Sequence, residues 1–194
     1  CNVDYFKEIY SIDEISQKIL DGKNADEDIL QITKNLHLNN SVVDLTDWNN
    51  NTILHIAAQS TSPYAKECLK AALEKGMDIN ARNDDKETPL ISAINAYICA
   101  GTTEKQIALM QNIKLLLDCE PNVDLVDNNK QSALHKVCQS GNLILFNEIL
   151  KLNPKINQID INGNTPFQYI PTNANVPMYI TAREYLKQNN IIKG

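Results

Sequence analysis

Long apolar runs, glycine and aromatic residues are all scarce in this sequence. Glycine occurs 6 times in 194 residues, and aromatic residues make up 6% of the chain. The glycines form no phosphate-binding loop, and the motifs G-x-S-x-G and H-E-x-x-H are missing. No stretch approaches the roughly 18 consecutive apolar residues of a membrane span. The sequence therefore indicates neither a familiar catalytic motif nor a membrane-spanning helix.

Positive charge is also in deficit, because 24 acidic residues face 18 basic ones and the net charge is −6. This balance disfavours nucleic acid and anionic membranes as partners. The five cysteines are scattered, odd in number and without a C-x-x-C pair, and only 3 histidines accompany them. We therefore expect no disulfide framework, no metal site, no cofactor and a reducing compartment. Because the chain starts at Cys1 rather than Met, we also expect a fragment or a processed form.

Two amphipathic helices are predicted within residues 127–158. Ser132 occupies an N-cap position, and Gly141 ends the first helix as a C-terminal glycine does. The second helix stops at Asn153-Pro154. Two short helices cannot bury their apolar stripes against each other alone, so the unit needs neighbours. The apolar positions at helical spacing are Leu134, Val137, Cys138, Leu143, Phe146, Ile149 and Leu150.

Similar units recur along the chain at spacings of 36, 44 and 33 residues. Their helix-start residues are Thr52, Thr88, Ser132 and Thr165. Five residues before each start lie Asp47, Asn83, Asp127 and Asp160. Three residues before those lie Asp44, Asn80, Asp124 and Asn157.

A period near 33 with a turn and two helices per unit resembles ankyrin repeats. The resemblance covers residues 44–170, and each repeat carries only part of the Thr-Pro-Leu-His motif, such as Thr88-Pro89-Leu90. It implies an all-α solenoid of helix–turn–helix units with β-turn or hairpin-like connections. We expect one domain over residues 1–194, with a degenerate capping repeat at 11–46. The further repeats are expected at 47–82, 83–126, 127–159 and 160–190, the last as a C-terminal cap.

The second repeat is about eleven residues longer than the family period. We expect its two helices to be lengthened, with a capping box from Thr103 to Gln106. Tyr97, Ile98 and Met110 are expected to extend the buried stripe.

No set of side chains predicts catalysis, so we expect that the protein is not an enzyme. His55 and His135 match the motif histidine, and we assign them a structural role in bonding the backbone near the turn. Cys138 lies three residues after His135, on the packed helix rather than in a cleft. Asp84 and Asp85 are expected on an exposed turn tip, which is not the setting of a catalytic pair of carboxylates.

The resemblance implies a protein–protein interaction scaffold, monomeric and intracellular, that holds its partner on a concave surface. Trp48 is either an aromatic anchor of that surface or a residue that packs on the capping repeat, and the sequence favours neither. The alternative function is substrate recognition within a larger enzyme or ubiquitin-ligase assembly. Abundant Asn, Ile and Lys suggest an AT-rich genome and an effector-like protein of an intracellular microbe, cytoplasmic or, if secreted, in the host cytoplasm. An acidic centre favours a partner with a basic surface. The expected binding residues, all assumed to be exposed and dispensable for stacking, are Trp48, Asn49, Asn51, Gln59, Ser60, Asp84, Asp85, Glu87, Asn95, Asn128, Asn129, Gln131, Gln139 and Ser140.

Overall fold

The computed structural model describes residues 46–170 and 177–188, which contain seven α-helices, one 3-10 helix and no strand. The chain divides into two compact units, unit 1 (Cys1–Asn122) and unit 2 (Val123–Gly194), and we describe each by itself. The all-α fold class expected from the sequence is confirmed. The capping repeat expected at residues 11–46 lies, apart from Thr46, outside the described residues.

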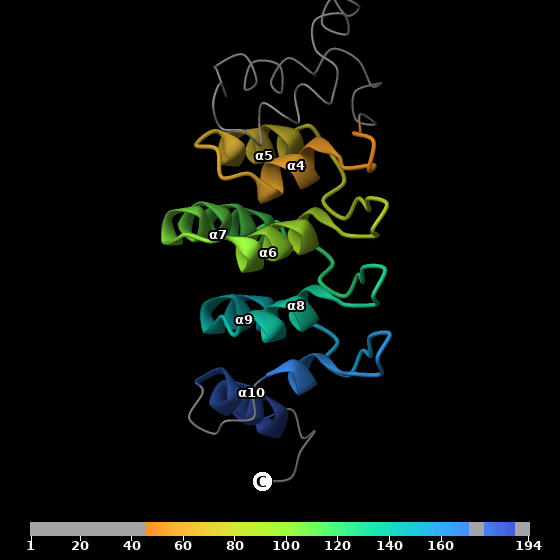
Figure 1. The fold of residues 1–194 in the computed structure, drawn as a ribbon, viewed down its shortest axis with the longest axis vertical. Helices are drawn as coiled ribbons and strands as arrows, with labels where there is room; N and C mark the ends of the chain where they lie inside the picture. The colour runs from red at the N-terminus through yellow and green to blue at the C-terminus, as the bar shows by residue number, and fades with distance from the viewer. Residues whose placement is uncertain (1–45, 171–176, 189–194) are drawn as a thin grey trace, which may run out of the picture. The chain divides into compact units, whose positions relative to one another are not determined.

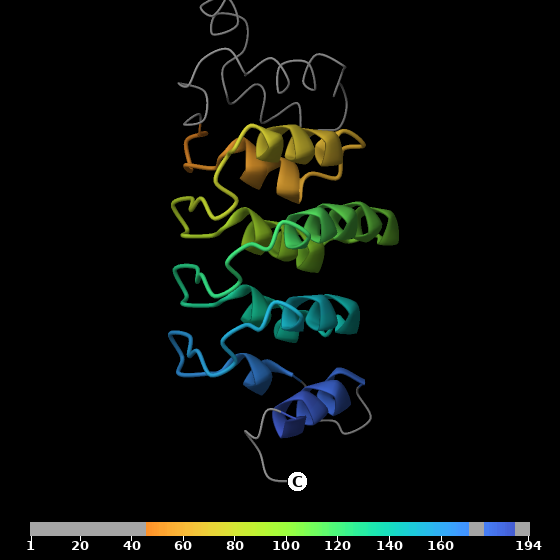
Figure 2. The ribbon, with the colours of Figure 1, turned by 180° about the vertical axis from the view of Figure 1, so that it is seen from behind.

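The described part of unit 1 consists of two helix pairs (Figure 1). The first pair is α4 (Ile53–Gln59) with α5 (Ala65–Glu74), and the second is α6 (Pro89–Cys99) with α7 (Thr103–Leu117). Figures 1 and 2 show each pair as one layer, with α6 packed on α4 and α7 packed on α5. The layers bury the apolar side chains that recur at helical spacing, namely Ile53, Leu54, Leu69, Leu90, Ile94 and Ile113.

The first helix of each pair begins where the alignment of the repeats within this chain predicts. Thr52 and Thr88 precede α4 and α6 with extended backbone angles. The Thr88 hydroxyl accepts a hydrogen bond from the backbone N–H of Ile91 at 3.3 Å. Pro89 follows at the first helical position, where a missing N–H costs nothing. Local chemistry therefore fixes these helix starts.

The second pair is longer than the first, as expected. Helices α6 and α7 have 11 and 15 residues, against 7 and 10 in α4 and α5. Two details of the expectation are wrong. The N-cap of α7 is Thr102 rather than Thr103, and its hydroxyl accepts from the Lys105 N–H at 3.4 Å. Ile98 is 40% exposed, and Tyr97 and Met110 are half-buried, because the added turns run past the shorter helices of the first pair.

Unit 2 contains α8 (Ala133–Ser140), α9 (Leu143–Leu150), the 3-10 helix η2 (Pro166–Tyr169) and α10 (Pro177–Gln188). Helix α8 packs against α9 and η2, and α10 packs against α9. Gly141 ends α8 in the left-handed region, with φ 69°, as the sequence predicts. The core contains the fully buried Leu134, Phe146 and Ile149, and the Phe146 ring meets the Phe167 ring edge to face at 5.9 Å.

The fourth aligned unit starts at Thr165 but forms only the four residues of η2. The residue before a proline avoids the α conformation, and Ile170 precedes Pro171, so the helix cannot continue. The last helix expected from Tyr179, Ala182 and Tyr185 is present as α10.

Candidate partner-binding surface

A hairpin-like turn, which we call a tip, precedes each of the helices α4, α6, α8 and η2. One Asp or Asn side chain closes each tip by accepting backbone N–H groups. In the tip of α4, Asp47 Oδ1 accepts the backbone N–H groups of Asn49 at 2.9 Å and Asn51 at 2.8 Å. The Asp47 N–H donates to the Asn51 carbonyl at 3.0 Å, which completes the turn. Aspartate and asparagine are suited to this role because their short side chains reach the backbone two residues onward.

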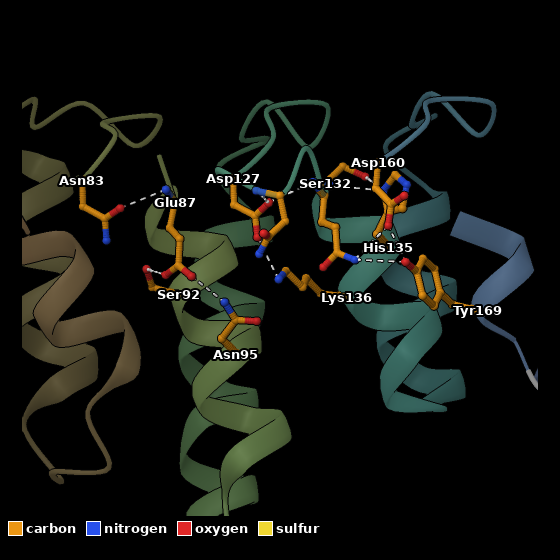
Figure 3. A network of polar contacts seen from close by, with 12 residues as sticks. Asn83, Glu87, Ser92, Asn95, Asp127, Ser132, His135, Lys136, Asp160 and Tyr169 are labelled. Carbon is orange, nitrogen blue, oxygen red and sulfur yellow. Dashed lines mark hydrogen bonds and ion pairs between the residues drawn. The ribbon is translucent and has the colours of Figure 1, made fainter. Parts of the chain in front are cut away.

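The same closure recurs in the other tips. In unit 2, Asp127 Oδ1 accepts from the N–H groups of Asn129 and Gln131, each at 2.9 Å. Asp160 Oδ1 accepts from Asn162 and Asn164 at 2.9 and 3.0 Å. In unit 1, Asn83 Oδ1 accepts from Glu87 at 2.9 Å (Figure 3). The Asp or Asn residue that lies five positions before each helix start is therefore the residue that closes the tip.

The fourth residue of each tip takes a left-handed backbone conformation. The φ values are 56° for Asn50 and Lys86, 57° for Lys130 and 77° for Gly163. Only glycine adopts this region without steric cost, so the two lysines are held there by the surrounding turn.

Neighbouring tips within a unit are joined by their backbones. In unit 1, the Asp84 N–H donates to the Asn49 carbonyl at 3.0 Å, and the Asn50 side chain donates to Asp84 Oδ1 at 2.6 Å. In unit 2, the Ile161 N–H donates to the Asn129 carbonyl at 3.0 Å, the equivalent bond. The tips of each unit therefore form a continuous edge (Figures 1 and 2).

Two buried histidines connect the starts of α4 and α8 to the tip that follows each of them. The backbone N–H of Thr52 can only donate, so His55 Nδ1, 3.2 Å away, accepts. The proton then lies on Nε2, which donates to the Glu87 carbonyl at 3.0 Å. His135 repeats this arrangement with Ser132 N–H at 3.1 Å and the Asn164 carbonyl at 3.3 Å. The structural role expected for both histidines is confirmed.

Burial lowers the pKa of His55 and of His135 below the ordinary value of 6.5. The carbonyl of Glu87 and the charge of Asp47 oppose this for His55, and the carbonyl of Asn164 and the charge of Asp160 oppose it for His135. The neutral form is favoured because a proton on Nδ1 would face the backbone N–H that donates to it.

The tip that precedes α6 carries a carboxylate, Glu87, that is held by two neutral donors from α6. Glu87 accepts the Ser92 hydroxyl at 2.7 Å and the Asn95 amide at 2.6 Å (Figure 3). All three side chains come from one tip and its own helix. The arrangement fixes the direction of a half-buried negative charge.

In unit 2, the carboxylates of the two tip-closing aspartates are buried in the fold. Lys136 Nζ lies 2.8 Å from Asp127 Oδ2, and both side chains are buried (Figure 3). Asp160 Oδ2 accepts the Tyr169 hydroxyl and the Gln131 amide, the latter at 3.1 Å. Burial raises the pKa of Asp160, but these bonds and those from backbone N–H groups outweigh it and hold the pKa well below its usual range.

The fourteen expected binding residues divide by exposure. Trp48 is 81% exposed, and Asp84, Asp85, Asn128, Asn129 and Gln139 are also exposed. Five are half-buried, namely Asn49, Gln59, Glu87, Asn95 and Ser140. The assumption of exposure is wrong for the remaining three, which are Asn51, Ser60 and Gln131.

These three residues are buried because each bonds other parts of the fold. Asn51 accepts the Asn83 amide at 2.8 Å and so joins two tips. Gln131 donates to Asp160 in the same way in unit 2. Ser60 accepts the Ser62 N–H at 3.1 Å, and its carbonyl accepts Asn112 Nδ2 at 2.9 Å. They contribute to stacking, contrary to expectation.

Two isoleucines and a lysine are among the exposed tip residues that the sequence did not predict to be part of the surface. Ile159 and Ile161 are each 57% exposed, and Lys130 is exposed on the adjoining tip. The signal was available, because Ile161 follows Asp160 as Trp48 follows Asp47.

Cys138 is fully buried on α8, as expected, and burial raises the pKa of its thiol. Among residues 46–170 and 177–188, no group of three or more His, Cys, Asp or Glu side chains could hold a metal ion. In the same part of the chain, no helix has the length and apolar character needed to cross a bilayer.

Helix pairs joined by closed, exposed tips define a helical repeat scaffold for protein interaction. Residues 23–101 match the family model described as ankyrin repeats (3 copies). Beyond that match, the tips at Asp127 and Asp160 have the same closure. Ankyrin repeats are generally protein–protein interaction modules and are typically non-enzymatic.

Proposed function

We propose that the protein is a non-catalytic binding module whose tips and exposed first-helix faces hold a partner protein. The observation that carries the proposal is the exposure of Trp48, at 81%, on a tip closed by Asp47 and joined to its neighbour. A large aromatic side chain on a rigid support binds with little loss of conformational freedom. Such residues dominate the energy of protein interfaces.

The chemistry of the surrounding surface suggests the partner's charge. Asp84 and Asp85 are exposed on the adjacent tip, and Glu87 is held half-buried behind them. These groups favour a partner with a basic surface, mainly through the association rate. Asn51, Ser60 and Gln131 are left out of the proposed surface because their side chains are engaged in the fold.

Affinity capture with matched variants tests the proposal. The whole chain, Trp48→Ala and Ile144→Ala would be immobilised and the retained proteins compared by quantitative mass spectrometry. Ile144 is 60% exposed on α9 and serves as the control for losing an exposed apolar side chain. A partner retained by the unmodified chain and Ile144→Ala but lost with Trp48→Ala supports the proposal. A partner retained equally by all three contradicts it.

A further inference from the structure

Unit 2 presents a second recognition surface whose chemistry differs from that of unit 1. Ile159 and Ile161 flank the buried Asp160, and each is 57% exposed. Asp160 is turned inward, where its carboxylate accepts the backbone N–H groups that close the tip, whereas both isoleucines are exposed to solvent.

The isoleucines lie beside the preceding tip. The N–H of Ile161 donates to the Asn129 carbonyl at 3.0 Å, and Lys130 follows Asn129 in the chain. Asn128 and Asn162 are also exposed at these two tips. We call the residues 128–130 and 159–162 the unit 2 tip surface.

The exposed charge of this surface is positive. Asp160 is buried within it and bonded to Tyr169 and Gln131, and the adjoining Asp127 is buried against Lys136. Lys130 is exposed. The surface therefore offers two aliphatic side chains, amide groups and an ammonium group to a partner.

The tips of unit 1 carry a different character. There, the carboxylates of Asp84 and Asp85 are exposed beside Lys86, and the apolar residue is the aromatic Trp48. One kind of partner segment cannot suit both sets of tips equally well, because like charges brought together at an interface oppose binding.

We propose that the unit 2 tip surface binds a protein segment in which aliphatic side chains alternate with carboxylates. The aliphatic groups would pack on Ile159 and Ile161, and a carboxylate would pair with Lys130. This inference rests on the proposed function, since it assigns a partner chemistry of their own to the tips of unit 2.

Two synthetic peptides of equal length and leucine content test the inference, one alternating leucine with glutamate and the other leucine with lysine. Each would be titrated into the ¹⁵N-labelled whole chain, and amide chemical shifts recorded. The glutamate peptide should shift the amides of residues 128–130 and 159–162, and its binding should weaken as salt rises because screening reduces the charge attraction.

Two variants sharpen the test. Ile161→Ser and Lys130→Asp should each weaken glutamate-peptide binding roughly tenfold, the effect of losing about 1.4 kcal/mol of contact energy. Aspartate tolerates the left-handed conformation at position 130. Ile144→Ser, which removes an exposed isoleucine from α9, should change the affinity little.

The inference is overturned if the glutamate peptide leaves these amides unmoved, or if the lysine peptide shifts them equally. The lysine peptide reports separately on the proposed function through the amides of residues 48–50 and 84–87. Loss of that signal alone would count against the binding role of unit 1 and leave the unit 2 surface standing.

Discussion

The Asn112 side chain lies against the backbone of Ser60, 52 residues earlier in the sequence, and its Nδ2 donates to the Ser60 carbonyl at 2.9 Å. The same amide reaches the carbonyls of Ala57 and Ala58 at 3.2 and 3.3 Å. Helix α4 ends at Gln59 without a glycine, so its last carbonyls need donors from elsewhere. Helix α7 of the following repeat supplies them, which couples the two layers of unit 1.

Replacing Asn112 should therefore destabilise unit 1. Asn112→Leu keeps the branched shape of the side chain but leaves buried carbonyls without donors, and we expect a loss of about 1–3 kcal/mol in the free energy of unfolding. Urea unfolding followed by circular dichroism measures it. Gln111→Ala, an exposed neighbour on the same helix, is the control and should stay within about 0.5 kcal/mol. Equal stability of the two variants would contradict the coupling.

The left-handed tip residues predict a stabilising substitution. Lys86 has φ 56°, so Lys86→Gly should relieve steric strain and stabilise the protein by about 0.5 kcal/mol or more. Gly163→Ala should do the opposite by about 1 kcal/mol, because alanine is strained at φ 77° although nothing lies within 4 Å of the added carbon. Thermal melting of both variants checks the pair. Shifts of the same sign would refute the explanation.

The two buried histidines predict a loss of stability in mild acid. Their pKa values are lower in the folded chain than the ordinary 6.5, so the unfolded chain binds more protons as the pH falls below 6.5. The stabilisation that comes from keeping the two histidines neutral is complete above pH 6.5 and is lost as the pH falls. At pH 5.5 the loss is at most about 1.4 kcal/mol for each histidine.

The double variant His55→Gln/His135→Gln isolates this effect. Glutamine suits the position, because Gln168 Oε1 already accepts the Thr165 N–H at 2.6 Å in the fourth tip. The variant should lose less stability than the unmodified chain between pH 7.5 and pH 5.5. Parallel stability curves over this range would show that the histidines are not responsible.

Leu134 is fully buried in unit 2, as the sequence predicts. Leu134→Ala should cost roughly 2–5 kcal/mol through lost burial and a residual cavity. Hydrogen exchange should show the loss in α8, α9 and η2, which pack together around it. Gln139→Ala, exposed on the same helix, provides the comparison, and a melting temperature unchanged by Leu134→Ala would contradict the packing.

Charge reversal at Asp84 tests the acidic tip once a partner is captured. Asp84→Lys should mainly slow association and flatten its salt dependence, because steering acts before contact. Glu74→Lys makes the same charge change at an exposed site on α5. Surface plasmon resonance at two salt concentrations separates the rates. Equal effects of the two variants would indicate a response to net charge rather than to the tip.

Features determined within one repeat could be predicted from the sequence. The N-caps at Thr52 and Thr88, the stop at Gly141 and the burial of Leu134 depend on neighbours close in the chain. The recurrence of Asp or Asn five residues before each helix start could also be recognised in the sequence. Only the structure showed that these side chains close the tips.

Features that depend on a second repeat could not be predicted. Asn51 and Gln131 occupy tip positions that look exposed in sequence, but each side chain reaches an Asx residue of the next tip. The role of Asn112 could not be predicted from the sequence, because the carbonyls that accept its hydrogen bonds lie more than 50 residues away in the chain. The one-residue error at Thr102 arose because Thr102 and Thr103 are equally good caps on composition alone.

The closure of each tip by one side chain also has a consequence for how this protein can change over generations. Since the side chains of Asp47 and Asp160 close their turns, the side chains that follow them are not needed for the closure. At these positions the chain carries Trp48 and Ile161, an aromatic and an aliphatic side chain. A single substitution per repeat can therefore alter what the surface recognises at little cost in stability. A change of partner through such mutations need not include a variant that fails to fold.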